Sequence, residues 1–328
     1  MIEALIRDSN PIRESDLPGR DSLEVRRLLS QIRYEPHRRV HYAKSISVGV
    51  AAAAIAVGVV TQGLLSLGSS APSAAAAEFH RLSAIAAAAI NTGPPAPGQY
   101  QFTDSVSKTE ASLNMDSPQT TINIFYDLHR QIWIGTDGSG RIAESTSNVS
   151  FATATDRMHW LALGSPSLFG AGLVTNQSFG PQGLSDGPTN LWNLPTDTAT
   201  LASQISSRTI EGGPPGTQED FVQIGDLLRE TDAPPALRAA LFQVASNLPG
   251  IRLLGLVTTQ TGQAGIGIAM PMPNASLDEL IFDPTTSALL GEQVVTNSDD
   301  AIPVISTWTS YLQSGVVDST SSTVTKSS

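Results

Sequence analysis

The sequence predicts an α+β protein: an N-terminal transmembrane helix, then an extracytoplasmic domain with helices packed on a curved antiparallel β-sheet. Three observations carry this prediction. Residues 45–67 contain no charged side chain. This uncharged stretch is long enough for one helical crossing of a bilayer core about 30 Å thick. From residue 99 onward, apolar residues recur with a period of two, which is typical of strands. Between about residues 200 and 250 the period becomes that of amphipathic helices.

Composition and charge exclude several classes of protein. The chain has 328 residues, of which 40% are hydrophobic and none is cysteine, so disulfides, thiolate metal sites and cysteine catalysis are excluded. Residues 1–44 carry nine Lys or Arg and seven Asp or Glu, whereas the remaining residues carry ten and twenty-three. The body of the protein is therefore acidic. Because affinity for nucleic acid depends on clustered cations, we expect no nucleic-acid partner.

Residues 45–67 are predicted to be a single-pass membrane anchor. Arg38, Arg39 and Lys44 precede the stretch, and the next charge after it is Glu78. By the positive-inside rule, the N-terminus is cytoplasmic and the later residues are extracytoplasmic. A cleaved signal peptide and a buried helix of a soluble protein are the alternatives. A leader of 44 residues is too long for the first alternative, and the basic flank disfavours the second.

The leader, residues 1–44, is predicted to contain one short amphipathic helix. Val25, Leu28, Leu29 and Ile32 follow one another at the spacing of a single helical face. A segment this short cannot bury a core of its own. The face either lies on the inner membrane surface or docks on a cytoplasmic partner such as a regulator, and both interpretations stay open.

The outer domain is predicted to span residues 79–315, after a small-residue linker at 68–78 and before a disordered tail at 316–328. A helix is expected around Phe79 and Leu82, ended by the Pro- and Gly-rich stretch that follows residue 90.

Alternating strands follow this first helix. Apolar residues alternate with polar ones from Tyr100 to Val106 and from Ile122 to Ile134, and Asp-Gly at 137–138 predicts a hairpin turn. Residues 157–163 are predicted to be a further strand, and 164–195 a long connection.

Helices and a second set of strands complete the domain. Helices are predicted near residues 201–205, 217–230 and 234–248, the last beginning at a proline pair. Strands are expected from residue 251 to about 312, separated by short Gly-, Pro- and Asn-containing turns.

No motif in the sequence indicates catalysis, a metal site or a cofactor. Residues 183–187 read GLSDG, but the strand and helix that make such a serine reactive are not predicted around it. His129 and His159, assigned to two strands, form only a weak candidate for a metal pair. The acidic pairs at 219–220, 278–279 and 299–300 are most simply explained as helix or strand surface. We therefore predict that the protein is not an enzyme.

Five stretches of the chain carry a resemblance to known proteins: NPIRESDLPGRDSLEVRRLL, QYQFTDS, DLHRQIWIGTDGSGRIAE, PPALRAALFQVASNLPGIRLLG and LDELIFDPTTSALLGE. They resemble a family of actinobacterial single-pass membrane proteins, whose genes often lie beside genes for extracytoplasmic-function sigma factors. The resemblance implies an accessory or anti-sigma-like role, although the absence of cysteine departs from the zinc-binding signature of many anti-sigma domains. The outer domain is more remotely similar to the LolA/RseB-like fold, whose members hold acyl chains or sense lipoproteins.

These expectations favour a binding or sensing protein at the membrane over a structural envelope protein, with an enzyme as the least favoured class. The partners expected are a lipid or lipoprotein outside the membrane and a sigma factor or other regulator inside it. We expect the apolar ligand face to be formed by residues of the early strands: Tyr100, Phe102, Ile124 and Trp133.

Overall fold

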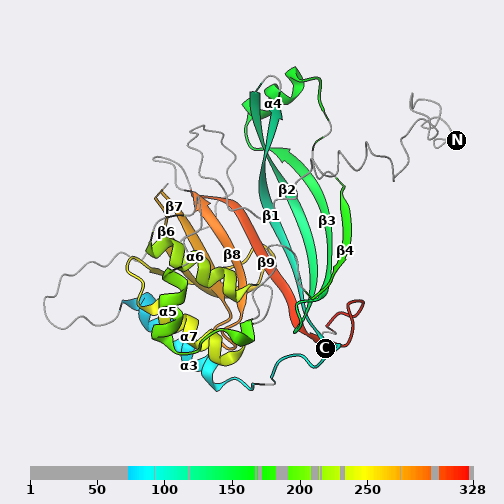
Figure 1. Ribbon diagram of the computed structural model, residues 1–328. Coiled ribbons are helices and arrows are strands. Elements are labelled where there is room, and N and C mark those ends of the chain that lie inside the picture. Colours follow the sequence, from blue (N-terminus) through cyan, green and yellow to red (C-terminus); the bar gives the residue numbers. More distant parts are fainter. Residues whose placement is uncertain are drawn as a thin grey trace, which may run out of the picture. The chain divides into compact units, whose positions relative to one another are not determined.

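The computed structural model describes most of the chain beyond residue 72 (Figure 1). The expected leader, with Val25, Leu28, Leu29 and Ile32, and the expected anchor at 45–67 lie outside the described residues. Within the described part of the chain, no helix is both long and apolar enough to cross a membrane. The described residues are 73–91, 93–116, 119–166, 168, 172–181, 191–207, 214, 216–229, 233–273, 275–296 and 303–324.

In the described part of the chain, one antiparallel sheet of nine strands organises the domain, and it confirms the α+β class with a large curved sheet. The strand order is β4-β3-β2-β1-β9-β8-β7-β6-β5, so two meanders meet where the first strand pairs with the last. The strands are β1 (Tyr100–Asp116), β2 (Gln119–Gly135), β3 (Gly140–Phe151), β4 (Val174–Phe179), β5 (Arg252–Thr258), β6 (Ala264–Pro271), β7 (Ser276–Phe282), β8 (Leu289–Thr296) and β9 (Val304–Val317).

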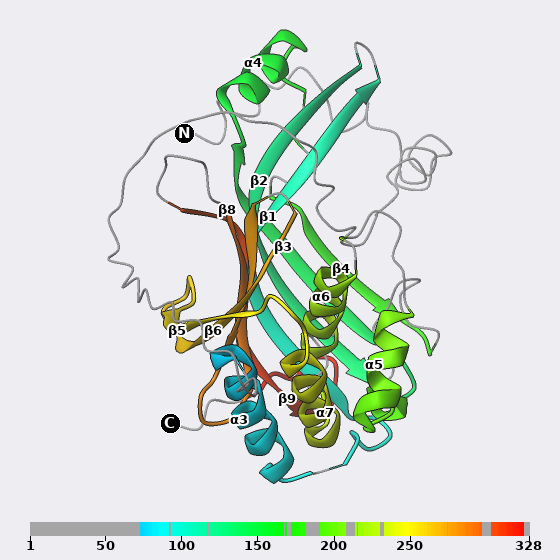
Figure 2. The same ribbon diagram turned by 90° about the vertical axis from the view of Figure 1, so that its left-hand side faces the viewer.

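Helices lie mainly on one face of this sheet (Figure 2). Ser73 caps the first of them, because its hydroxyl accepts a hydrogen bond from the Ala76 backbone N–H at 3.1 Å. Pro235 begins the last, where its missing N–H costs nothing. The helical elements are α3 (Ala74–Ala88), α4 (Ala154–Ala162), the short 3₁₀ turn η2 (Leu191–Asn193), α5 (Thr198–Ser206), α6 (Thr217–Leu228) and α7 (Pro235–Ser246).

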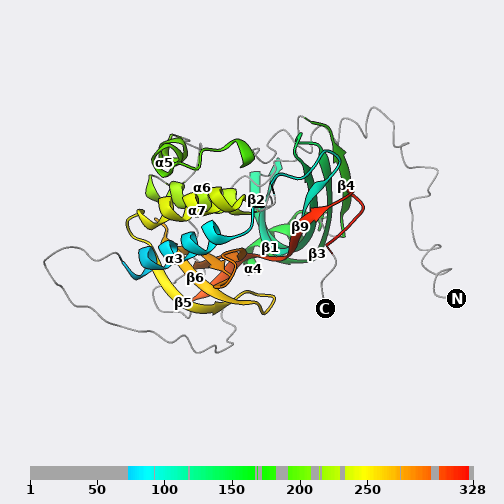
Figure 3. The ribbon, with the colours of Figure 1, turned by 90° about the horizontal axis from the view of Figure 1, so that it is seen from below.

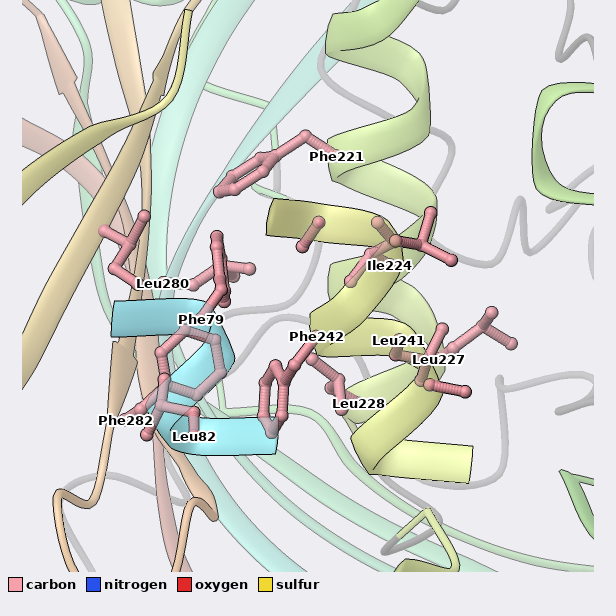
Figure 4. Close-up of a cluster of buried hydrophobic side chains, with 14 of the residues drawn as sticks. Phe79, Leu82, Phe221, Ile224, Leu227, Leu228, Leu241, Phe242, Leu280 and Phe282 are labelled. Carbon is pink, nitrogen blue, oxygen red and sulfur yellow. The ribbon is translucent and has the colours of Figure 1, made fainter. Parts of the chain in front are cut away.

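The main core lies between α3, α6, α7 and strands β6 and β7 (Figure 4). Three phenylalanines form its centre: the Phe242 ring lies 6.0 Å from that of Phe79 and 5.3 Å from that of Phe282. All three side chains are fully buried. The apolar residues whose spacing predicts α3, α6 and α7 are thus the residues that fill this core.

The two faces of the sheet differ, and the register defines them. Thr103 pairs with Ile132, whereas Phe102 pairs with Trp133, so successive rungs of β1 and β2 point to opposite sides. Thr103 shares a pocket with residues of α6 and α7, so we call its side the helix face and the Phe102 side the outer face. Figure 3 shows the sheet curving around the helices on the helix face.

The hairpin predicted at Asp137-Gly138 is confirmed. The Gly135 N–H bonds the Ser139 carbonyl at 2.7 Å, and Gly138 takes a positive φ of 82° that suits glycine. The Asp137 carboxylate accepts hydrogen bonds from both the backbone N–H and the hydroxyl of Ser139. This turn joins β2 and β3.

The prediction of a strand at 157–163 is wrong, because these residues belong to helix α4 and the turn after it. Thr153 caps the helix: its hydroxyl accepts from the Asp156 N–H at 3.0 Å and donates to the Asp156 carboxylate. The pair resembles a capping box, and the Thr-x-x-Asp spacing that produces it is present in the sequence. The connection predicted at 164–195 likewise contains a strand, β4.

The prediction of a disordered tail at 316–328 is wrong for residues 316–324, which the structure describes. β9 continues to Val317, and the backbone carbonyls of Thr320 and Ser322 accept hydrogen bonds from β3 and β2 side chains. A composition rich in Ser and Thr is typical of disorder, but here main-chain carbonyls make the contacts. The amino-acid composition of this segment therefore does not predict whether it is ordered.

Candidate functional site

A small pocket lies on the helix face where β1 and β9 meet the ends of α6 and α7. Its volume of about 30 Å³ holds about two water molecules and not an acyl chain. Its wall combines hydroxyl, guanidinium and aliphatic groups, which suits the polar end of an amphipathic ligand. The lining residues are Thr103, Leu228, Arg229, Ala233, Arg238, Ala288, Leu289, Tyr311 and Ser314.

Charged groups form a cluster beside this pocket. Arg229, just after α6, donates from Nε to Glu292 of β8 at 2.8 Å and also pairs with Asp226. The Tyr311 hydroxyl of β9 donates to the other oxygen of Glu292 at 3.1 Å. Burial lowers the pKa of Arg229, but the charges of Glu292 and Asp226 raise it by more, so Arg229 stays charged. The cluster ties the helix layer to the centre of the sheet.

Asp278 of β7 is the group in this region that titrates near neutrality. Burial, and then the negative charge of Glu292, raise the pKa of Asp278 to about 7, while Arg229 lowers it. On the outer face, burial also raises the pKa of Glu279, although Gln293 donates a hydrogen bond to it at 2.8 Å. The charge of this part of the sheet therefore changes around pH 7.

We expect Asp278→Asn to remove a pH dependence of stability. A carboxyl whose folded pKa exceeds its unfolded value destabilises the fold once it ionises, so the wild-type chain loses stability as the pH rises from about 4 to about 7. The variant should be more stable than wild type at pH 8 and equal to it at pH 4. Urea unfolding at the two pH values measures this difference. The control Asp137→Asn should show no gain at pH 8, because hydrogen bonds lower the pKa of Asp137; a gain there equal to that of Asp278→Asn contradicts the prediction.

A two-column track runs along the helix face of β1 and β2, starting at the pocket. Thr103, Ser105, Ser107 and Thr109 of β1 form a column of small hydroxyl side chains. On β2 these hydroxyl residues pair in turn with Ile132, Arg130, Leu128 and Tyr126, and the β2 column continues with Ile124 and Ile122 opposite Ala111 and Leu113. The aliphatic members are Ile122, Ile124, Leu128 and Ile132, all of them buried.

Arg130 lies within the track and pairs with Glu144 of β3. Their side chains, 13% and 9% exposed, approach to 3.5 Å. The pKa of Tyr126 is raised, mainly by burial and secondly by the charge of Glu144. The track is thus aliphatic at both ends and polar at the Arg130 rung.

The structure divides the predicted ligand face, so that prediction is wrong as a single surface. Phe102 and Trp133 share the outer face, with their ring centroids 5.1 Å apart, and Tyr100 packs beside them. Ile124 lies on the helix face, because it pairs with Ala111, which is on the same side of β1 as Thr103 and on the opposite side from Phe102. Alternation within β2 already carries this signal, since Ile124 and Trp133 lie an odd number of residues apart in one strand.

The outer-face aromatic residues are covered by the chain itself. Phe102 is fully buried and Trp133 is 2% exposed, with Val317 and Val324 packed in the same cluster. The surface expected for an apolar ligand is therefore occupied in this structure by residues near the C-terminus.

The histidines and acidic pairs do not assemble into one site. His129 bonds Asp104 at 2.7 Å on the outer face, whereas His159 lies on helix α4 and not on a strand as predicted. Glu219 is buried and accepts from Gln223 at 3.0 Å. Asp278 and Glu279 point to opposite faces, and 183–187 and 299–300 lie outside the described residues. In the described part of the chain, no group of three His, Asp or Glu side chains could hold a metal ion.

Sequence reasoning missed the charged cluster. Glu292 was visible as the one charged residue of a strand rich in Leu and Val, which is a usable signal for a buried partner. Its partner Arg229 lies 63 residues earlier in the chain, so the pairing depends on the tertiary fold.

Comparison with known proteins gives little further information. No protein-family model matches the chain, and no curated protein matches it. Among solved structures it is similar to a chain from the MucA/MucB complex of Pseudomonas aeruginosa, with 11% identity and a TM-score of 0.27. The match covers 75% of this chain and spans 58% of the length of the other. A score this low does not establish a shared fold.

Proposed function

We propose that this protein is a membrane-anchored extracytoplasmic binding module whose ligand is an acyl chain with a polar head, as in a lipid or lipoprotein, and that it is not an enzyme. The observation that carries the proposal is the two-column track of β1 and β2. Anchoring by residues 45–67 with a cytoplasmic N-terminus is part of the proposal and rests on the charge pattern of the sequence.

The track suits an amphipathic chain because of the sizes of its side chains. Hydroxyl residues on β1 are small, while their aliphatic neighbours on β2 are large, so a ligand over β1 would lie against the side of the β2 column. The main core cluster contains none of the aliphatic residues of the track. In the structure these side chains are buried, so an acyl chain would reach them only when the parts of the chain that cover them move aside.

The polar head of such a ligand would lie at the pocket. Thr103 belongs both to the track and to the pocket wall, and it pairs with Ile132 of the aliphatic column. Arg229, Arg238 and Tyr311 line the same pocket, and both Arg229 and the Tyr311 hydroxyl donate to Glu292 beside it. Guanidinium and hydroxyl groups of this kind are suited to carboxylate or phosphate oxygens. The pocket volume limits this end of the ligand to a few atoms, unless side chains move.

A titration tests this proposal. The full-length chain, purified in a non-ionic detergent, is titrated with a fluorescent fatty acid. We expect saturable binding of one probe molecule per chain that is competed by unlabelled fatty acid. Binding that rises linearly with probe concentration and is not competed would contradict the proposal, because it would report partition into detergent only.

We further propose that the leader carries the signal to a cytoplasmic regulator through Val25, Leu28, Leu29 and Ile32. Burying four such side chains contributes about 1.5–3 kcal/mol each before the costs of association. Leu28→Asp with Leu29→Asp should therefore abolish capture of a sigma factor or other regulator by the full-length chain, while membrane insertion is unchanged. The matched control is Ser22→Asp with Ser30→Asp. Equal capture by both double variants, or no capture by wild type, would contradict this proposal and favour a helix that lies on the membrane surface.

A further inference from the structure

We propose that the outer-face cluster around Phe102 and Trp133 is a docking site for a short Ser/Thr-rich polypeptide segment, and that residues 318–324 of this chain occupy it as a removable strap. This site lies on the face opposite the track, so the inference does not depend on the proposed acyl ligand.

The site holds the strap through its main chain. The Trp133 indole N–H donates to the Ser322 carbonyl at 2.7 Å, and the Arg141 guanidinium donates to the Thr320 carbonyl at 2.8 Å. The same guanidinium lies 4.8 Å from the Trp133 ring centroid, over its face. Arg141 is itself positioned by Asn176 of β4, which accepts from Nε at 2.8 Å. The donors are therefore preorganised by strands and recognise carbonyl groups, which any polypeptide offers.

The strap is polar except for one residue. Val324 packs on the aromatic cluster and lies against Gly315, where an added Cβ would come 3.0 Å from a Val324 methyl carbon. The hydroxyls of the strap bond mainly to each other: Ser319 bonds Ser321 at 2.9 Å and Ser322 at 2.8 Å. The strap thus contributes one aliphatic side chain and two carbonyls to the cover of an aromatic pair on which Val317 of β9 also packs.

This arrangement makes the strap exchangeable. The strap buries little apolar area of its own. Its binding to the aromatic cluster therefore depends on the covalent link to β9, which keeps the local concentration of the strap high. A competing segment of the same chemistry, with carbonyls placed for Trp133 and Arg141 and an aliphatic residue at the position of Val324, would fit the vacated site.

Binding of a labelled peptide tests the inference. A fluorescein-labelled peptide with the sequence of residues 318–324 is titrated into full-length wild type, Val324→Asp and Thr323→Asp, and anisotropy is recorded. Val324→Asp weakens the strap, so it should bind the peptide at least about tenfold more tightly than wild type. Thr323 is exposed, so the control Thr323→Asp should match wild type. Adding Trp133→Phe to Val324→Asp should remove binding, because the indole donor is lost.

Equal binding by wild type and Val324→Asp, or none by either, overturns the inference when circular dichroism shows both to be folded. Should Val324→Asp fail to fold, a chain that ends at Val317 takes its place, with the same expectation.

A second measurement follows the strap in place. Because the chain has no cysteine, Thr323→Cys, at an exposed position of the strap, labels one position with bimane, which Trp133 quenches on contact. Quenching that Trp133→Phe relieves supports a strap bound within the chain, and quenching that depends on protein concentration indicates exchange between copies and contradicts it.

Discussion

Phe242→Ala is expected to lower the free energy of unfolding by about 3–5 kcal/mol. The Phe242 ring contacts those of Phe79 and Phe282 in the centre of the main core and is fully buried. Truncation removes the transfer free energy of the ring and leaves a cavity between α3, α7 and β7. Because these elements come from distant parts of the sequence, the cavity cannot close by a local adjustment. Thermal and urea unfolding of the full-length chain measure the loss.

The matched control is Leu256→Ala, on edge strand β5. Its side chain is 76% exposed, so its removal should change the free energy of unfolding by less than about 0.5 kcal/mol. A loss for Phe242→Ala no larger than that of Leu256→Ala would show that the three phenylalanines do not hold the helix layer to the sheet.

Ser107→Phe is expected to reduce acyl-probe affinity at least about tenfold, or about 1.4 kcal/mol. Ser107 lies in the hydroxyl column, and its hydroxyl is 3.2 Å from that of Thr109. A phenylalanine there occupies the space beside Leu128 that the proposed ligand requires. Overpacking should also cost about 1–3 kcal/mol of stability, so unfolding is measured in parallel.

Val106→Phe controls for this change on the same strand. Val106 precedes Ser107 and points to the outer face, where it pairs with His129. Both variants introduce the same phenylalanine side chain on one strand, although Ser107→Phe adds more volume than Val106→Phe, and they differ in the face that the ring fills. We expect Val106→Phe to bind the probe as wild type does; an equal loss in both variants would place the ligand elsewhere.

The sequence predicts the elements of this fold better than their assembly. Long apolar periodicities mark α3, α6 and α7 because each buries one stripe in a common core. The pairing of β1 with β9 is not local, since Tyr100 meets Val317 across the whole domain. No pattern within either strand encodes that partner, and the joining of the two meanders into one sheet could not be predicted.

The candidate sites depend on the same long-range pairings. Residue types alone identify Phe102 and Trp133 as apolar partners, and the structure places them together. Their cover by residues 318–324 was missed because backbone carbonyls, which every residue carries, accept the bonds from Trp133 and Arg141. The division between Ile124 and Trp133 follows from alternation within β2, whereas the pairing of Phe102 with Trp133 depends on the register between β1 and β2.

Native mass spectrometry of the full-length chain tests the binding proposal most directly. Wild type, Val106→Phe and Ser107→Phe are purified from membranes in parallel, and the mass of retained lipid is recorded for each. Residues 45–67 would hold lipid of their own if they span the membrane, so the difference between variants is the informative quantity. We predict that wild type and Val106→Phe retain one more acyl-bearing molecule than Ser107→Phe. Equal lipid retention in all three folded proteins would contradict an acyl-binding track on β1 and β2.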